Sequence, residues 1–377
     1  MRYVLFSLSA LVFYAIFYFS FVNGLNALAE KSVASGKLPG ANEPLRTVYT
    51  GVEPVDHLLT ILTTFFYPAL DGQNATLLLH SVGFSGTFGA AWTLVVVESW
   101  RKGNTGTIAA YPAVFGLMAQ VFTFAFATPL LCGLQLGCSI TAKRPHADNI
   151  RVPRAVLVSL PLIFIIGFMV PTHAMVLPAP TLISVDLKQI AIAIWQPWPA
   201  YVSILATLSY FILSPLFPNN HRASMSSLRW VYAFAFFNAA VPHLVSWTLS
   251  LSSVLVPVIY NDRFLDALHP ANVFSVPLPW SGQTVDTVAE GVHFFLRWDY
   301  MIGSAGILLW ALKLYTVAHK QILSTVCWSG LLLKVGLLTV FAGPAGAAVE
   351  LMWERDELVF GETGGTRQQV TKAKKSS

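Results

Sequence analysis

The sequence predicts an all-α, polytopic transmembrane helical bundle, and three observations support this prediction. Hydrophobic residues make up 55% of the 377 residues, and charged residues make up 11%. The mean hydropathy is +0.62. A soluble domain carries about 25% charged residues, so this composition excludes a soluble core with an added anchor. Apolar stretches that approach or exceed the roughly 20 residues of a bilayer-crossing helix also recur along the whole chain.

These stretches predict about eight or nine membrane segments. The second of them is short and ends at Pro68, which leaves a tilted or re-entrant segment as an alternative to a full crossing. Together they predict a single bundle over residues 1–353, followed by a polar basic tail over residues 354–377 that is expected to be disordered. The candidate spans are 3–22, 57–70, 76–97, 107–136, 154–176, 195–217, 229–258, 289–312 and 321–349.

Loop charges predict the orientation of the bundle. The first span is interpreted as a retained anchor, although a cleaved signal peptide is the alternative. Basic residues such as Lys143 and Lys320 gather on one face of the predicted topology, which the positive-inside rule makes cytosolic. The ending Lys374-Lys375-Ser376-Ser377 resembles a dilysine retrieval signal and predicts the endoplasmic reticulum membrane. That signal must face the cytosol, whereas the count of predicted crossings places it on the opposite face.

Several chemistries lack their sequence motifs. There is no phosphate-binding loop, dinucleotide fingerprint or His-Glu-x-x-His zinc motif, and no Gly-x-Ser-x-Gly nucleophile elbow. The aspartate-rich boxes that bind diphosphate and magnesium are missing as well. No basic stripe interleaved with aromatic residues indicates nucleic-acid binding. The sequence therefore predicts no metal, no cofactor and no nucleic-acid partner.

Asp299 is the most deeply placed acid in the predicted spans. It lies nine residues after Glu290, which is roughly 14 Å along a helix axis at about 1.5 Å per residue. An ionised carboxylate at that depth is costly unless it is paired or protonated. The interpretation as a general acid competes with a structural ion pair to Arg297 or to a neighbouring helix. Arg297 is poorly placed for that pair, because residues two apart do not share a helix face.

Glu98 and Asp71 are two further candidate acids. Glu98 ends a strongly apolar stretch, and it precedes Arg101 and Lys102 at the spacing of a helical ion pair. A structural role for Glu98 therefore stands beside a functional one. Asp71 lies in Tyr67-Pro68-Ala69-Leu70-Asp71-Gly72, where it is also the residue type that a turn favours.

Polar and aromatic residues surround the eighth predicted span. Glu290, His293 and Arg297 fall on one helix face, which forms either the polar wall of a cavity or a network within the helix. Trp298 and Tyr300 flank Asp299, and Trp92 precedes Glu98. A lipophilic pocket with aromatic walls and a proton donor is suited to carbocation chemistry, because aromatic faces stabilise cations without trapping them.

Three short motifs resemble those of a fungal family. The motifs are Phe65-Phe66-Tyr67-Pro68 running into Asp71-Gly72, the stretch from Trp92 through Glu98 to Arg101, and Phe295-Leu296-Arg297-Trp298-Asp299-Tyr300. The family is that of the integral-membrane terpene cyclases of macrophorin- and ascofuranone-type meroterpenoid pathways. The resemblance covers most of the chain, including its length and its multispan layout.

The resemblance implies a metal-independent cyclisation that begins with protonation. The substrate is expected to be a lipophilic prenylated molecule, with a farnesyl chain or its terminal epoxide on a phenolic or cyclohexanoid polyketide. Asp299 or Glu98 is expected to donate the proton, with the other acid holding or recharging the donor. Asp71 is expected to position the donor or to act as the terminal base. The residues expected to bind the substrate are Tyr67, Trp92, His293, Arg297, Trp298 and Tyr300.

A proton-coupled transporter of a small lipophilic molecule is the main alternative function. Intramembrane acids, helices broken by proline and a histidine in a span would all suit such a carrier. Many transporters contain internal repeats with matching interrupted helices, and this sequence contains neither feature. Membrane lipid is a partner under both hypotheses.

Overall fold

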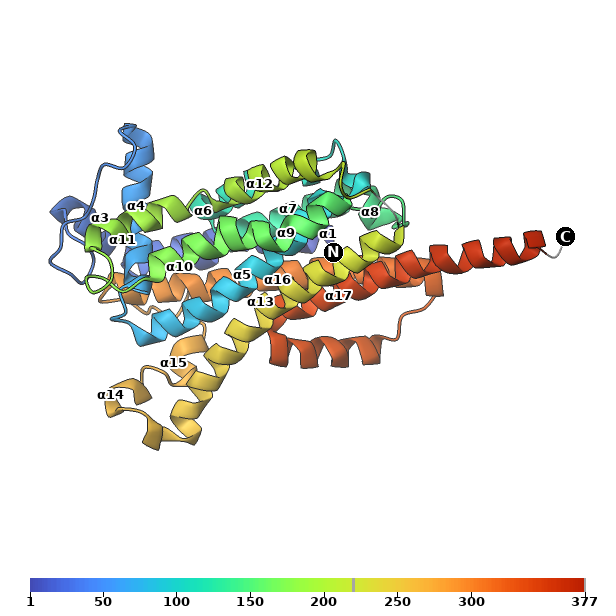
Figure 1. Cartoon of the computed structure of the whole chain (residues 1–377). Helices are drawn as coiled ribbons and strands as arrows, with labels where there is room; N and C mark the ends of the chain where they lie inside the picture. The colour runs from blue at the N-terminus through green and yellow to red at the C-terminus, as the bar shows by residue number, and fades with distance from the viewer. Residues whose placement is uncertain (219–220, 376–377) are drawn as a thin grey trace.

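The computed structural model describes the backbone of residues 1–218 and 221–375, and the side chains of residues 1–218 and 225–361. All the extended regular elements in this described part are helices, and most of the long ones run in a similar direction (Figure 1). The helices are α1 (Arg2–Val12), the π-helix η1 (Phe13–Tyr18), α2 (Phe19–Val22), α3 (Leu25–Ser35), α4 (Glu53–Leu70), α5 (Ala75–Ser99), η2 (Lys102–Asn104), η3 (Ile108–Ala110), α6 (Pro112–Phe122), α7 (Phe124–Cys138), α8 (Ile140–Lys143), α9 (Arg154–Phe164), the π-helix η4 (Ile165–Met169), α10 (Val170–Val176), α11 (Val185–Trp195), α12 (Trp198–Leu213), α13 (His221–Leu255), η5 (Pro257–Ile259), α14 (Asp262–Leu265), α15 (Pro270–Phe274), α16 (Val288–Leu323) and α17 (Trp328–Lys375).

The predicted polytopic helical bundle is confirmed, but it has fewer membrane-capable helices than the sequence predicts. Within the described residues, five helical stretches are long and apolar enough to cross a bilayer. A sixth is added if α11 and α12, which are bent by 56° relative to each other, form one broken span. The prediction of about eight or nine segments is therefore too high. By length and composition the five stretches are Arg2–Val22, Arg154–Val176, Met225–Leu255, Val288–Leu323 and Trp328–Gly361, and the last of them is broken at Gly343.

A break at Thr123 explains why one of the predicted spans is not a single crossing helix. The apolar stretch 107–136 is divided there into α6 and α7, which have 11 and 15 residues. Each is shorter than the roughly 20 residues that a crossing needs. Thr123 has a φ of 81°, a backbone conformation that β-branched residues rarely adopt, so a helix cannot continue through it.

α4 stands in the place of the second predicted span and crosses the direction of the long helices at one end of the bundle (Figure 1). It carries Glu53 and Asp56 in its first turn and Pro68 near its end, and it is not among the membrane-capable helices. It packs against α16 and α11. A full crossing by this segment is therefore not supported, and the tilted and re-entrant alternatives both remain open.

α17 consists of two segments that meet at Gly343, where φ is 73°. The chain turns back on itself at this glycine (Figure 1). Lys334 of the first segment pairs with Glu354 of the second, so the two segments lie side by side. The last predicted span, 321–349, is therefore not one continuous crossing.

This reversal changes the face on which the chain ends. The second segment of α17 leaves the bundle at the end that carries α8 and the connection from α16 to α17 (Figure 1). Lys143 and Lys320 belong to the same end. The loop charges and the dilysine-like ending therefore no longer conflict, although the side chains of Lys374 and Lys375 lie outside the described residues.

The polar tail predicted from residue 354 is wrong for residues 354–361. Arg355 and Asp356 are completely buried, because they belong to a network of charged residues inside the bundle. These positions therefore continue the bundle beyond residue 353. The side chains of residues 362–377 are outside the described part of the chain, and their disorder stays a prediction.

α5 is the central helix of the bundle and packs against α13, α16 and α17. Its residues from Gly86 to Ser99 are all buried. Small residues allow the close approach to α13: a Cβ atom at Gly86 would lie 2.4 Å from the carbonyl oxygen of Asn238. The apolar length of α5 is therefore covered by protein.

Candidate active site

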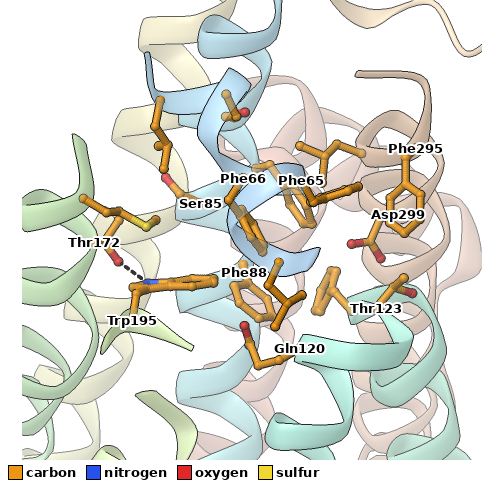
Figure 2. Close-up of a pocket in the computed structure, with 18 of the residues that line it drawn as sticks. Phe65, Phe66, Ser85, Phe88, Gln120, Thr123, Thr172, Trp195, Phe295 and Asp299 are labelled. Atoms are coloured by element: carbon orange, nitrogen blue, oxygen red, sulfur yellow. Dashed lines mark hydrogen bonds between the residues drawn. The ribbon is translucent and has the colours of Figure 1, made fainter. Parts of the chain in front are cut away.

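A largely apolar cavity of about 310 Å³ lies among α4, α5, α6, α10, α11 and α16. This volume falls at the lower end of the range of small-molecule sites, which is about 300–1,000 Å³. Asp299 is the only ionisable side chain among the described residues that line it. Figure 2 shows Asp299 beside Phe295 and Thr123, with Thr172 and Trp195 on another side of the cavity.

Hydrogen bonds from the start of α7 hold the Asp299 carboxylate. Its Oδ1 accepts a hydrogen bond of 2.6 Å from the backbone N–H of Ala125. The hydroxyl group of Thr123 and the backbone N–H of Phe124 also donate to this carboxyl. The side chain is 5% exposed. A negative charge is favourable at a helix N-terminus, because the first N–H groups have no partner within the helix.

The break at Thr123 creates this arrangement. Because α6 ends at Phe122, the first N–H groups of α7 are free to bond with Asp299 rather than with the preceding turn. Gly303, one turn after Asp299 on α16, lets α7 approach closely. A Cβ atom at Gly303 would lie 2.2 Å from the Phe124 ring. The local conformation therefore depends on contacts between helices that are distant in the sequence.

Aromatic rings form most of the cavity wall. Many of them meet edge to face, including Phe65 with Phe295 at 4.8 Å and Phe88 with Phe124 at 5.1 Å between ring centroids. Such pairs hold the rings in defined orientations. Trp195 donates a hydrogen bond of 2.9 Å to the Thr172 hydroxyl group, as the dashed line in Figure 2 marks. The aromatic lining residues are Phe17, Phe65, Phe66, Phe84, Phe88, Phe124, Phe168, Trp195 and Phe295.

Glu98 lies in a different part of the bundle, within a buried network of charges. Its Oε2 atom is 2.5 Å from Nε of Arg101 and 3.3 Å from Nη1 of Arg355. Arg101 also contacts Asp356 at 2.8 Å, and the Tyr232 hydroxyl group donates to Asp356 at 2.7 Å. Both arginines are therefore neutralised by acids, and α5, α13 and α17 are tied together.

Glu98 and Asp299 are not brought together by the structure. Glu98 is absent from the cavity lining, and both of its oxygen atoms accept hydrogen bonds, from Gln135 at 2.9 Å, from Thr141 and from the arginines. The ion pair with Arg101 that the spacing indicated is present, but Lys102 is not part of it. These contacts favour the structural interpretation of Glu98.

The polar face of α16 contacts residues 272–277 through hydrogen bonds to their backbone carbonyl groups. Nε2 of His293 lies 3.1 Å from the carbonyl oxygen of Val273, and Nε1 of Trp298 donates to that of Pro277 at 2.8 Å. Arg297 donates to the carbonyl oxygens of Asn272, at 3.3 Å, and of Ser275. Arg297 does not pair with an acid within 4 Å among the described residues, which includes Asp299.

His293 and Arg297 line a second cavity, of about 530 Å³, together with Glu290. Most of the wall of this cavity comes from α16 and residues 271–283, and none of its lining residues lines the first cavity. The expectation of a cavity wall on this helix face is therefore met, but by a cavity that Asp299 does not line.

The remaining predicted residues lie behind the lining. Trp92 packs its ring against Phe88, with centroids 6.3 Å apart, and Tyr300 meets Phe84 at 6.0 Å. Tyr67 is buried on α4, next to the lining residue Phe66.

Asp71 ends α4 and accepts the N–H of Gln73 at 2.8 Å, as a turn residue does. Burial raises the pKa of the Asp71 carboxyl, whereas the Gln73 amide and Lys188 lower it.

The sequence alone does not identify most of the residues that form the cavity wall. Phe65, Phe66 and Phe295 belong to the motifs that resemble the cyclase family, but those motifs alone do not place them in the site. Phe84 and Phe88 are four residues apart and share a helix face, which is a periodic signal that the sequence does contain. Thr123 has no comparable signal, because its conformation depends on packing between α7 and α16.

Known proteins resemble this chain over nearly its whole length. The CtvD domain family matches residues 1–360. The terpene cyclase ctvD of Aspergillus terreus is 36% identical, over 94% of this chain and 98% of its own length. The terpene cyclase penA of Penicillium crustosum is 27% identical, over 93% of this chain and 94% of its own.

A further relative agrees with this assignment. The terpene cyclase ascI of Acremonium egyptiacum is 28% identical, over 91% of this chain and 88% of its own length. No solved structure matches the chain significantly. The cyclase relatives do not favour the transporter alternative, and they confirm the resemblance that the three motifs carried. The chain therefore belongs to the CtvD family of fungal, membrane-embedded terpene cyclases.

Proposed function

We propose that this cyclase closes rings in the farnesyl or epoxyfarnesyl chain of a polyketide-derived aromatic or cyclohexanoid compound, with a proton as the trigger and without a metal ion. The observation that carries the proposal is the position of Asp299, the one ionisable side chain among the described residues of the cavity wall. Protonation of an alkene or an epoxide releases no diphosphate. The absence of aspartate-rich boxes from the sequence agrees with that chemistry.

Asp299 is the proposed proton donor. It protonates the terminal alkene, or the oxygen atom of the terminal epoxide, and leaves a carbocation or an opening epoxide. The electrons of the next double bond form a carbon–carbon bond to the cationic carbon, and each ring closure moves the positive charge along the chain. A base removes a proton from the last cation. The product is an isomer of the substrate, which corresponds to isomerase- or lyase-type chemistry.

The surroundings of Asp299 support this role. The donors at the start of α7 stabilise the carboxylate that remains after the proton has left. The aromatic rings of the wall stabilise cations along the folded chain. A general acid contributes about 10²–10⁴-fold to a rate. Holding the polyene in a folded conformation supplies much of the remainder.

The other predicted acids receive different roles in this proposal. Glu98 fixes the position of α5 relative to α13 and α17 through the charge network. Asp71 orders the turn after α4, directly beside the lining residue Leu70. The terminal base is not assigned to either residue, because neither lines the cavity. Residence in the endoplasmic reticulum membrane is part of this proposal.

Turnover in microsomes tests the proposal. Microsomes that contain the chain are given a farnesylated orsellinic-type phenol or its terminal epoxide, and products are identified by mass spectrometry. We expect an isomer of unchanged mass. Asp299→Asn is expected to lower its rate by about 10²–10⁴-fold. The matched control is Ser304→Ala, a buried polar position on the same helix that does not line the cavity, and it should retain turnover.

Two further variants separate the roles of the acids. Glu98→Gln leaves two buried arginines with one carboxylate, and breaking such a network costs about 3–5 kcal/mol, so less folded protein is expected. Asp71→Asn should affect the rate less than Asp299→Asn does. Full turnover by folded Asp299→Asn protein would exclude Asp299 as the donor. No conversion by the wild type, together with uptake of the phenol into proteoliposomes, would favour the transporter alternative.

A further inference from the structure

The aromatic cavity has an open side, where its lining residues reach the surface of the protein. Ile61 of α4 is 43% exposed, and Val121 near the end of α6 is 45% exposed. Phe17 of the π-helix η1 is partly exposed at the same cavity. These three residues come from three separate elements, and each lines the cavity that Asp299 lines. The opening is therefore a gap between elements.

Apolar side chains continue from this opening onto the outer surface. On α4, Val55, Leu58 and Ile61 are spaced three residues apart, share one helix face, and are 42%, 37% and 43% exposed. Near the other edge, Phe122 is 44% exposed and Phe13 of η1 is 53% exposed. The surface around the opening is apolar on both sides.

Contacts between aromatic rings lie at the inner end of the opening. Phe17 meets Phe295 at 6.2 Å, and Phe65 meets Phe295 at 4.8 Å between centroids. Phe295 therefore joins η1, α4 and α16 at a point four residues before Asp299 on the same helix. Thr123, two residues after Val121, donates a hydrogen bond to Asp299. The opening thus adjoins the part of the cavity that contains the proposed proton donor.

We propose that this gap, formed by Phe17, Ile61 and Val121, is a lateral portal through which the prenyl chain of the substrate enters from the bilayer. The inference rests on the proposed function, because it specifies how the cyclase takes up its substrate. An apolar surface around an opening is unfavourable in water but favourable against lipid. A prenylated compound dissolves in the bilayer, and its chain passes from lipid to cavity without crossing water.

Kinetics of portal variants in proteoliposomes provide the first test. Ile61→Trp and Val121→Trp narrow the gap without changing Asp299 or its hydrogen-bond donors. We expect kcat/KM for the farnesylated phenol to fall by at least about tenfold, with a smaller change in kcat at saturation. Leu162→Trp and Ile204→Trp are matched controls, because both residues are exposed apolar positions away from the cavity. Equal kcat/KM in portal and control variants would overturn the portal.

A fluorescence measurement tests the portal without turnover. Ile61→Cys and Val121→Cys are prepared in a Cys138→Ser, Cys327→Ser background, labelled with a bimane and placed in phosphatidylcholine with brominated acyl chains. We expect quenching at both positions, and partial recovery when farnesyl phenyl ether displaces lipid from the gap. A label at Leu162→Cys should be quenched without recovery.

The outcomes separate the portal from the catalytic proposal. Absence of quenching at residues 61 and 121, with quenching at residue 162, would show that lipid does not reach the gap. Quenching that the prenyl ether does not relieve would show that prenyl chains do not use it. Either result overturns the portal. If the wild type converts no substrate, the catalytic proposal fails, and quenching with recovery would still support a portal for prenyl chains.

Discussion

At the scale of single residues, the surroundings of each carboxyl group determine what it does. Asp299 meets helix N–H groups at an apolar cavity, whereas Glu98 meets two arginines. Asp56 shows a third environment, in which loop amides surround the carboxylate. Its Oδ1 accepts from the N–H groups of Tyr49 and Thr50 at 3.1 and 2.7 Å, and its Oδ2 from that of Gly51 at 3.0 Å. The residue type alone predicts none of these differences.

The loop before α4 should therefore be sensitive to acid. Burial raises the pKa of Asp56, but hydrogen bonds from Thr50, Tyr49 and Gly51 outweigh it and hold the pKa below its usual value. The folded state thus favours the ionised form, so its stabilising effect is fully present above the unfolded-state pKa of about 3.9. That effect is lost as the pH falls through the lower folded-state pKa.

Thermal unfolding in detergent checks this expectation. Asp56→Asn should lower the melting temperature at pH 7, and its difference from the wild type should shrink as the pH falls below about 4. Asp262→Asn is the control, because Asp262 is exposed and this substitution should leave the melting temperature almost unchanged. A difference between Asp56→Asn and wild type that stays constant over this pH range would contradict the assignment.

At the scale of elements, the approach of α7 to α16 positions the proposed proton donor. α7 begins one residue after Thr123, which has a φ of 81°. Its second residue, Ala125, donates to Asp299. Gly303 provides the space that the Phe124 ring occupies. The position of Asp299 relative to its hydrogen-bond donors therefore depends on the start of α7, on the packing of α16 against it, and on the absence of a side chain at Gly303.

Gly303→Ala should disturb this contact and lower activity. The new Cβ would lie 2.2 Å from the Phe124 ring, so α7 must shift away from Asp299. Overpacking of this kind costs about 1–3 kcal/mol. We expect turnover of the farnesylated phenol to fall by at least about tenfold, because displacement of a catalytic group by about 1 Å has large effects on rate.

Gly336→Ala is the matched control for this substitution. Gly336 also lies in a helix, and a Cβ atom there has no neighbour within 4 Å. The control should keep its activity and gain stability by roughly 0.5–1 kcal/mol. Unchanged turnover in Gly303→Ala would show that Asp299 does not depend on this contact.

At the scale of the whole molecule, the charge network and the cavity lie in different parts of the bundle. The network ties α5, α13 and α17 together, and the cavity lies among α4, α5, α6, α10, α11 and α16. The reversal at Gly343 brings the second segment of α17 into the network, which Arg355 and Asp356 enter. It also sets the face on which the chain ends.

Membrane topology is therefore predicted with the chain end and the loop after Lys143 on one face. In intact microsomes, an epitope after Ser377 should be accessible to protease on the cytosolic side. A cysteine at Thr47→Cys, in the loop before α4, should react with an impermeant maleimide only after the membrane is opened. Accessibility of both, or of neither, would contradict this topology.

Residue content and local patterns along the chain are sufficient to predict the class of the protein. Composition and apolar stretches predicted a helical membrane bundle, because each depends only on local residue content. The motifs predicted the cyclase family, which the relatives confirm. Burial depth along a helix singled out Asp299, and spacing predicted the Glu98–Arg101 pair. These inferences need only distances along one helix.

Contacts between distant helices establish which of those residues share a cavity. Asp299 meets Ala125, 174 positions away, and Glu98 meets Arg355, 257 positions away. No periodic pattern along one helix predicts contacts between residues so far apart in the sequence. The turn at Gly343 and the break at Thr123 likewise changed the number of crossings, because packing between distant helices holds both conformations. Membrane helices can be predicted because residue content and periodicity are local properties. The candidate active site cannot, because its residues come from helices that are distant in the sequence.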